Sequence, residues 1–173
     1  NFISIAESRW EMVVTKLPGK VFLTVRGPET KATQMYCPAE GEWLGIRFKL
    51  GTFMPQMLAS NLVDGGVNLP DASSKSFWLH GAAWQFPDFE NADTFVARLV
   101  REGLLTREPV VEAVLQNRPL DMSLRSVQRR FLHATGLTRG TLDQIERARQ
   151  AVTLLEKGVT IADAVYWTGY ADQ

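Results

Sequence analysis

A short basic run in the last third of the chain carries the side chains with the clearest chemical use. Arg125, Arg129, Arg130 and His133 fall between Ser123 and Thr135, and no acidic residue lies among them. Arginine presents a fork of donors that matches guanine O6 and N7, and glutamine, present here as Gln128, pairs with adenine through two hydrogen bonds. The chemistry that these residue types offer is recognition of DNA bases and phosphates.

The spacing within this run divides it into two faces if it is helical. Val127 and Phe131 are four residues apart and share the face that packs inward. The remaining polar side chains then point outward or sideways, and we expect them to face DNA: Arg125, Ser126, Gln128, Arg129, Arg130 and His133. Of these, Arg125, Gln128 and Arg129 are expected at base edges, and Arg130 and His133 at phosphates. The pattern alone leaves open that the arginines only solvate a surface helix.

Other kinds of chemistry lack the residues that they need. The sequence has no glycine-rich phosphate loop, no nucleophile elbow and no paired histidine and carboxylate motif, so we predict no enzyme and no catalytic residue. Cys37 is the single cysteine and has no His or Cys at ligand spacing, so we expect a buried strand thiol rather than a metal ligand. His80 is isolated and is expected to be structural. No metal and no cofactor are predicted.

The net charge of zero hides an uneven distribution along the chain. Residues 118–157 hold 8 Lys/Arg against 4 Asp/Glu, whereas residues 1–117 and 158–173 each carry a net charge of −2. A local excess of positive charge is what a helix facing phosphates requires. The overall charge therefore does not exclude binding to nucleic acid.

The residues that flank the basic run predict helices. Capping residues and 3.6-residue periodicity indicate five helices. The first begins near Asn91 and ends at Gly103, and the others cover Glu108–Asn117, Ser123–Thr135, Thr138–Lys157 and Thr160–Thr168. The connection at residues 118–122 is short. Two helices joined by a tight turn, the second of them basic, are typical of a helix-turn-helix.

The first half of the chain predicts a small antiparallel sheet or partial barrel. In residues 20–26 and 42–49 the side-chain character alternates with period two, and turn residues bound both runs. The second run places Leu44, Ile46 and Phe48 on one face. Shorter strands are expected at residues 11–15, 33–37, 67–69 and 77–79, with a short helix at residues 54–60. The fold class predicted is α+β.

Three motifs in order resemble a known family. Met122–Gly136 is similar to the first recognition helix of the AraC-type (AraC/XylS) bacterial transcription regulators. Arg147, Ala151, Leu154 and Leu155 resemble the linker helix of that family, and residues 160–173 resemble the opening of its second helix-turn-helix. More weakly, residues 45–51 are similar to a segment of the sensor domains in one branch of these regulators.

The resemblance implies a function and also marks departures. It places DNA-facing side chains at Arg125, Gln128 and Arg129, which are the three that the helical pattern selects. Val165 stands where the family usually has alanine. The second recognition helix of the family would follow Gln173, so we expect a C-terminally truncated regulator with weak, mostly non-specific binding, with Kd toward roughly 10⁻⁴–10⁻⁶ M at physiological salt.

These observations together predict a sensor or dimerisation domain at residues 1–86 and a helical DNA-binding domain at residues 91–173. The expected partners are double-stranded DNA, a small-molecule effector and a second copy of the chain, with no membrane and a cytoplasmic location. The tryptophans of the front domain, Trp10, Trp43, Trp78 and Trp84, are expected to be core more than pocket. The alternative is a ligand-binding or dimerisation module whose helical tail no longer binds DNA.

Overall fold

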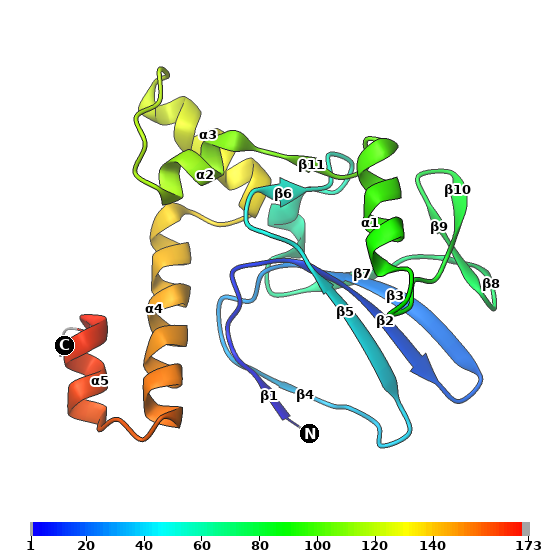
Figure 1. The fold of residues 1–173 in the computed structure, drawn as a ribbon, viewed down its shortest axis with the longest axis horizontal. Helices are drawn as coiled ribbons and strands as arrows, with labels where there is room; N and C mark the ends of the chain where they lie inside the picture. The colour runs from blue at the N-terminus through cyan, green and yellow to red at the C-terminus, as the bar shows by residue number, and fades with distance from the viewer. Residues whose placement is uncertain (1, 171–173) are drawn as a thin grey trace.

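The computed structural model describes residues 2–170, and the fold over this range is mixed α+β (Figure 1). The strands are β1 (Phe2–Ser4), β2 (Glu11–Leu17), β3 (Lys20–Arg26), β4 (Thr33–Met35), β5 (Glu42–Arg47), β6 (Thr52–Phe53), β7 (Gly66–Asn68), β8 (Asp71–Ser73), β9 (Ser76–Leu79), β10 (Ala82–Gln85) and β11 (Thr106–Arg107). The helices are the 3-10 helix η1 (Ala59–Leu62), α1 (Ala92–Arg101), α2 (Pro109–Leu115), α3 (Leu124–Thr135), α4 (Arg139–Glu156) and α5 (Ile161–Thr168).

The largest sheet has four antiparallel strands in the order β5-β2-β3-β7. β2 and β3 form a hairpin over the two residues Pro18 and Gly19, in which Gly19 takes the positive φ of 75° that such a turn requires. Alternate residues of the strands, such as Met12 and Val14 on β2, point into the core. The predicted antiparallel sheet is therefore present.

Three smaller antiparallel sheets surround it: β10-β9-β8, β1-β4 and β6-β11. The last pairs Thr52–Phe53 from the first half of the chain with Thr106–Arg107, directly before α2. This short ladder attaches the start of the helical region to the segment that follows β5.

The main core lies between the four-stranded sheet, the β8–β10 hairpins and α1. Phe77, Trp84 and Leu99 are fully buried there, and Phe95 of α1 packs edge-on against both aromatic rings. Helix α1 and the residues that follow it therefore share a core with the sheet, although the predicted division at residues 86–91 assigns them to the helical part.

A second, smaller core holds the helices together. Val111 of α2, Phe131 and Ala134 of α3 and Leu142 of α4 are buried against one another, and Phe53 of β6 packs on them. The first half of the chain and the helices thus meet at β6.

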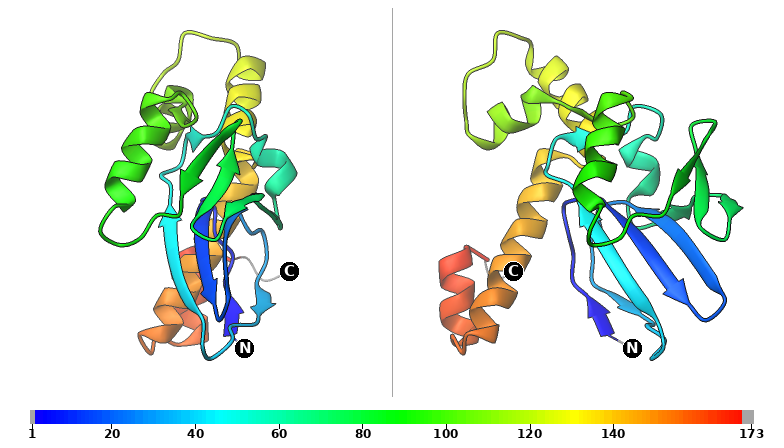
Figure 2. Two further views of the ribbon diagram at one scale, coloured as in Figure 1. Left: turned by 90° about the vertical axis from the view of Figure 1, so that its right-hand side faces the viewer. Right: turned by 45° about the vertical axis from the view of Figure 1, so that its right-hand side comes forward.

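Helix α4 leads away from this core, and α5 packs against α4 (Figures 1 and 2). The predicted ends of these helices agree with the structure, because Thr138 and Thr160 accept capping hydrogen bonds and Gly169 closes α5 with a φ of 67°. Among residues 2–170, no helix has the length and hydropathy to cross a membrane.

Several sequence-based expectations about single residues are corrected. Cys37 is exposed and lies outside β4, because the strand ends at Met35. Residues 54–58 are not helical, and only residues 59–62 form a 3-10 turn. Trp10 and Trp84 are core residues as expected, whereas Trp43 and Trp78 are 37% and 47% exposed.

Candidate nucleic-acid interface

Helix α3 is well defined at both ends by local hydrogen bonds. Ser123 is the N-cap, and its Oγ accepts from the backbone N–H of Ser126 at 3.2 Å. At the other end Gly136 adopts a left-handed conformation with φ 72° and donates to the carbonyl of Leu132. The predicted bounds of this helix are confirmed.

The inner face of α3 is fixed to the rest of the molecule. Phe131 is 3% exposed and Ala134 1%, and both lie in the core shared with α2 and α4. At the end of the helix Gly136 approaches the backbone of Ala59 in η1 so closely that a Cβ would lie 2.8 Å from its carbonyl. The helix is therefore held by η1 as well as by α2 and α4.

The outer face of α3 carries the predicted base-reading residues. Arg125, Gln128 and Arg129 are all exposed, and among residues 2–170 no acidic side chain forms an ion pair with either arginine. Arg125 and Arg129 are four residues apart, so their guanidinium groups leave the helix on the same side. Leu132 continues this side and is 42% exposed, which the sequence pattern did not single out.

Arg130 has a different environment from its neighbour Arg129. Its Nε and Nη2 donate to the two carboxylate oxygens of Glu108 at 3.0 and 2.7 Å. Glu108 is buried, and it also caps α2 by accepting from the N–H of Val110 at 3.1 Å. This arginine therefore joins α3 to the start of α2, and its positive charge is paired with the carboxylate of Glu108.

The last two predicted site residues are also partly engaged. Ser126 is half-buried, and its Oγ accepts a hydrogen bond from the Ser123 hydroxyl at 3.0 Å. His133 is exposed, and its ring packs edge-on against Phe53 of β6, with 5.2 Å between the ring centroids. The structure thus brings Arg125, Gln128 and Arg129 together as the free polar group, and gives Ser126, Arg130 and His133 additional structural contacts.

The connection between α2 and α3 is longer than expected. It runs over residues 116–123, whereas a typical helix-turn-helix has a turn of three or four residues. Asn117 takes a φ of 51°, and the N–H of Arg118 returns to the carbonyl of Ala113, so α2 ends earlier than the predicted Asn117. The connection between α2 and α3 is therefore longer than the turn of a typical helix-turn-helix.

Helices α4 and α5 follow α3 in the order that the sequence predicts. Helix α4 begins shortly after the end of α3, and α5 lies beside α4 (Figure 1). Ala164 is the buried contact of α5, while Ile161, Tyr166 and Trp167 are 74%, 82% and 61% exposed. Residues 171–173 of the predicted second module lie outside the described residues.

The part of the chain that the structure describes contains no group of three or more His, Cys, Asp or Glu side chains placed to hold a metal ion. Comparison with protein-family models, with curated proteins and with solved structures found no match to this chain. A function is therefore inferred from the geometry of the structure and from the sequence pattern.

Proposed function

We propose that the chain is a sequence-specific DNA-binding transcription regulator in which α3 enters the major groove. The observation that carries this proposal is the outer face of α3, where Arg125, Gln128 and Arg129 are exposed. The inner face of the same helix is packed in the core, and both of its ends are capped. Such a helix can enter the groove without reorganising, because its position is already determined by the core.

The residues of α3 have different roles under this proposal. Arg125 and Arg129 provide donor forks for guanine or for phosphates, and Gln128 provides a donor and an acceptor for adenine. Arg130 contributes less directly, since its ion pair with Glu108 fixes the angle between the helices. His133 lies against Phe53 of β6, and we assign it to phosphates beside the groove.

The resemblance to AraC-type regulators supports the same proposal. It adds that a front domain binds an effector or a second copy of the chain, and that α4 spaces two recognition helices along the DNA. Under this proposal the protein performs no bond-making chemistry.

Fluorescence anisotropy of a mixed-sequence duplex titrated with the chain tests the proposal. We expect binding that weakens steeply between about 50 and 200 mM salt, because each contacted phosphate releases counterions. Arg129→Ala should weaken binding further and, if the side chain contacts a phosphate, reduce the slope of log K against log salt by about one.

The matched control is Arg101→Ala, which removes an exposed arginine from α1, on a different helix. It changes the net charge by the same amount and should leave DNA affinity nearly unchanged. Equal losses in Arg101→Ala and Arg129→Ala would show that only total charge matters. No binding at low salt would refute the proposal and favour a module whose helical tail does not bind DNA.

A further inference from the structure

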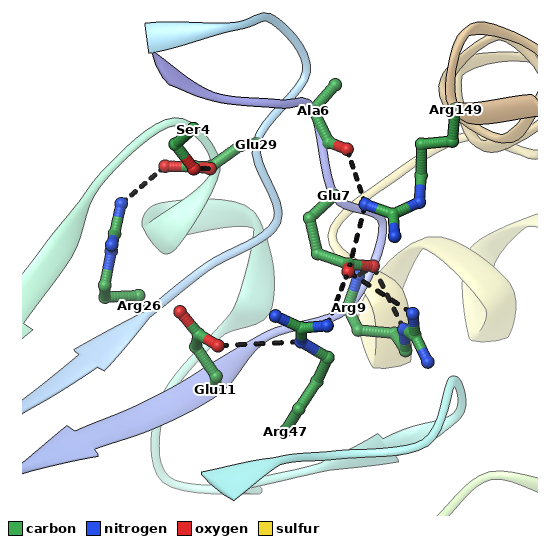
Figure 3. Close-up of polar contacts among 9 residues, drawn as sticks. All are labelled: Ser4, Ala6, Glu7, Arg9, Glu11, Arg26, Glu29, Arg47 and Arg149. Carbon is green, nitrogen blue, oxygen red and sulfur yellow. Dashed lines mark hydrogen bonds and ion pairs between the residues drawn. The ribbon is translucent and has the colours of Figure 1, made fainter. Parts of the chain in front are cut away.

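A single buried carboxylate lies where three parts of the chain meet. Glu7, in the segment between β1 and β2, is 7% exposed, and three arginines surround it (Figure 3). Its carboxylate oxygens lie 3.0 Å from Nε of Arg9, 3.3 Å from Nη1 of Arg47 on β5 and 3.2 Å from Nη1 of Arg149 on α4. Arg149 also donates to the carbonyl of Ala6 at 2.9 Å, so this cluster attaches α4 to the N-terminal segment.

The arginines of this cluster have more donors than the carboxylate can accept. Each guanidinium carries about five N–H donors, whereas a carboxylate has about four acceptor positions. Glu11 compensates Arg47 only loosely, at 3.6 Å, and the side chains of Arg47 and Arg9 are 49% and 38% exposed. Free guanidinium donors therefore remain on the side that faces solvent.

A cavity of about 310 Å³ lies on that side. Its walls include Arg9, Arg26, Arg47 and Arg149 together with the three carboxylates of Glu7, Glu11 and Glu29. Glu29 is already occupied, because it accepts from Arg26 and from the hydroxyl of Ser4. The lining thus has a net positive charge, and its volume is within the usual range for small-molecule sites.

The charge state of Glu7 is set by the same cluster. Burial raises the pKa of Glu7, but the hydrogen bonds from Arg9 and the positive charge of Arg149 outweigh it, so the pKa lies below its ordinary value. Glu146 of α4, which accepts from the Ser8 hydroxyl, is a further carboxylate close to Arg9. At neutral pH Glu7 is therefore ionised, and its carboxylate pairs with guanidinium groups that are also suited to bind an anion from solution.

We propose that this cavity binds a small anion bearing a carboxylate or phosphate group, held by Arg9, Arg47 and Arg149 in competition with Glu7. Binding then draws Arg149 away from Glu7 and weakens the attachment of α4 to the N-terminal segment. Planar guanidinium groups bind both kinds of anion through paired, charge-assisted hydrogen bonds. Anion binding by the cavity does not depend on the proposed function. A regulatory role of that binding does rest on the proposed function, in which α4 is the linker helix of the DNA-binding region.

Isothermal titration calorimetry of the whole chain with inorganic phosphate, and separately with succinate, tests the site and separates the two anion classes. We expect saturable binding of at least one probe. Arg47→Gln should weaken it about tenfold or more, since hydrogen bonds to charged groups contribute about 1.5–3 kcal/mol. This variant leaves Glu7 with Arg9 and Arg149, so we expect the fold to be retained. Arg101→Gln is the matched control, for which we expect unchanged affinity.

Glu7→Gln provides the sharper test of competition. Removing the internal charge should tighten anion binding, an effect that a purely structural role of Glu7 would not produce. Hydrogen exchange gives a second readout, because whichever probe binds should speed exchange at residues 6–9 and in α4 near Arg149. Failure of both probes to saturate, or equal losses in Arg47→Gln and Arg101→Gln, would overturn the site. Weaker binding by Glu7→Gln, or unchanged exchange, would overturn the competition.

These titrations contain no DNA, so their outcome is separate from the anisotropy experiment. Anion binding without DNA binding would leave the site and remove its proposed regulatory role. DNA binding without anion binding would leave the proposed function and remove the site.

Discussion

Replacing Glu108 by alanine removes the carboxylate that joins α2 to α3, and the structure allows its effect to be estimated. The loss of the cap on Val110 costs about 1 kcal/mol. The two bonds to Arg130, at 3.0 and 2.7 Å, have one buried and one 43% exposed partner, so their value lies between that of surface pairs and buried charged bonds, about 1–2 kcal/mol. We therefore expect Glu108→Ala to lower the free energy of unfolding by roughly 2–3 kcal/mol.

Urea unfolding followed by far-ultraviolet circular dichroism measures this in a double-mutant cycle. Arg130→Ala should cost less than Glu108→Ala, because the carboxylate keeps its capping bond. The coupling energy between the two positions should be about 1–2 kcal/mol. Arg129→Ala is the matched control and should change stability by less than about 0.5 kcal/mol, since its side chain is exposed. A coupling energy below about 0.5 kcal/mol would refute the structural role given to Arg130.

Three further predictions concern packing and pH. Phe131→Ala should lower the free energy of unfolding in urea by about 3–5 kcal/mol, because it empties a buried position in the helical core; a loss below about 1 kcal/mol would contradict that packing. Gly136→Ala should lower the thermal midpoint more than Gly103→Ala: both have positive φ, but only at Gly136 would the added Cβ meet backbone atoms, and equal effects would contradict the close approach. Glu7 has a lowered pKa, so its contribution to stability is present above the ordinary value of 4.5 and is lost as pH falls through the lower folded pKa. Urea midpoints from about pH 6 to 3 should therefore fall less steeply in Glu7→Gln than in the original chain, and parallel curves would contradict this.

The helix ends could be predicted because their causes are local. Ser123, Thr138 and Thr160 each cap a backbone N–H three residues ahead, and Gly136 closes α3 with a positive φ. These effects depend on residues within one turn of each other, so they are legible in the sequence.

The short strands could not be predicted in the same way. β6 and β11 have two residues each and exist because Thr52–Phe53 pairs with Thr106–Arg107 from a distant part of the chain. Two residues are too few to show a period of two. β1, β8 and β10, with three, three and four residues, were not anticipated either.

The candidate interface was predictable in its pattern but not in its pairings. Helical phase identified Arg125, Gln128 and Arg129 as outward residues, and the structure places all three at the surface. Helical phase also separated Arg130 from Arg129, but it could not show that Arg130 pairs with Glu108, because Glu108 lies 22 residues earlier. Hydrogen-bond partners at such separations leave no local signal.

The shared core of α1 and the sheet determines how the protein can be divided in the laboratory. A fragment that begins at residue 91 would expose Phe95, Leu99, Leu104 and Leu105, all of which are buried in the intact chain. Exposed apolar surface of this kind favours aggregation. A fragment that begins at residue 106 avoids those side chains but loses the strand β6 and the 3-10 turn against which α3 is held. Fusion proteins and shortened variants that contain α3 should therefore retain the front half of the chain.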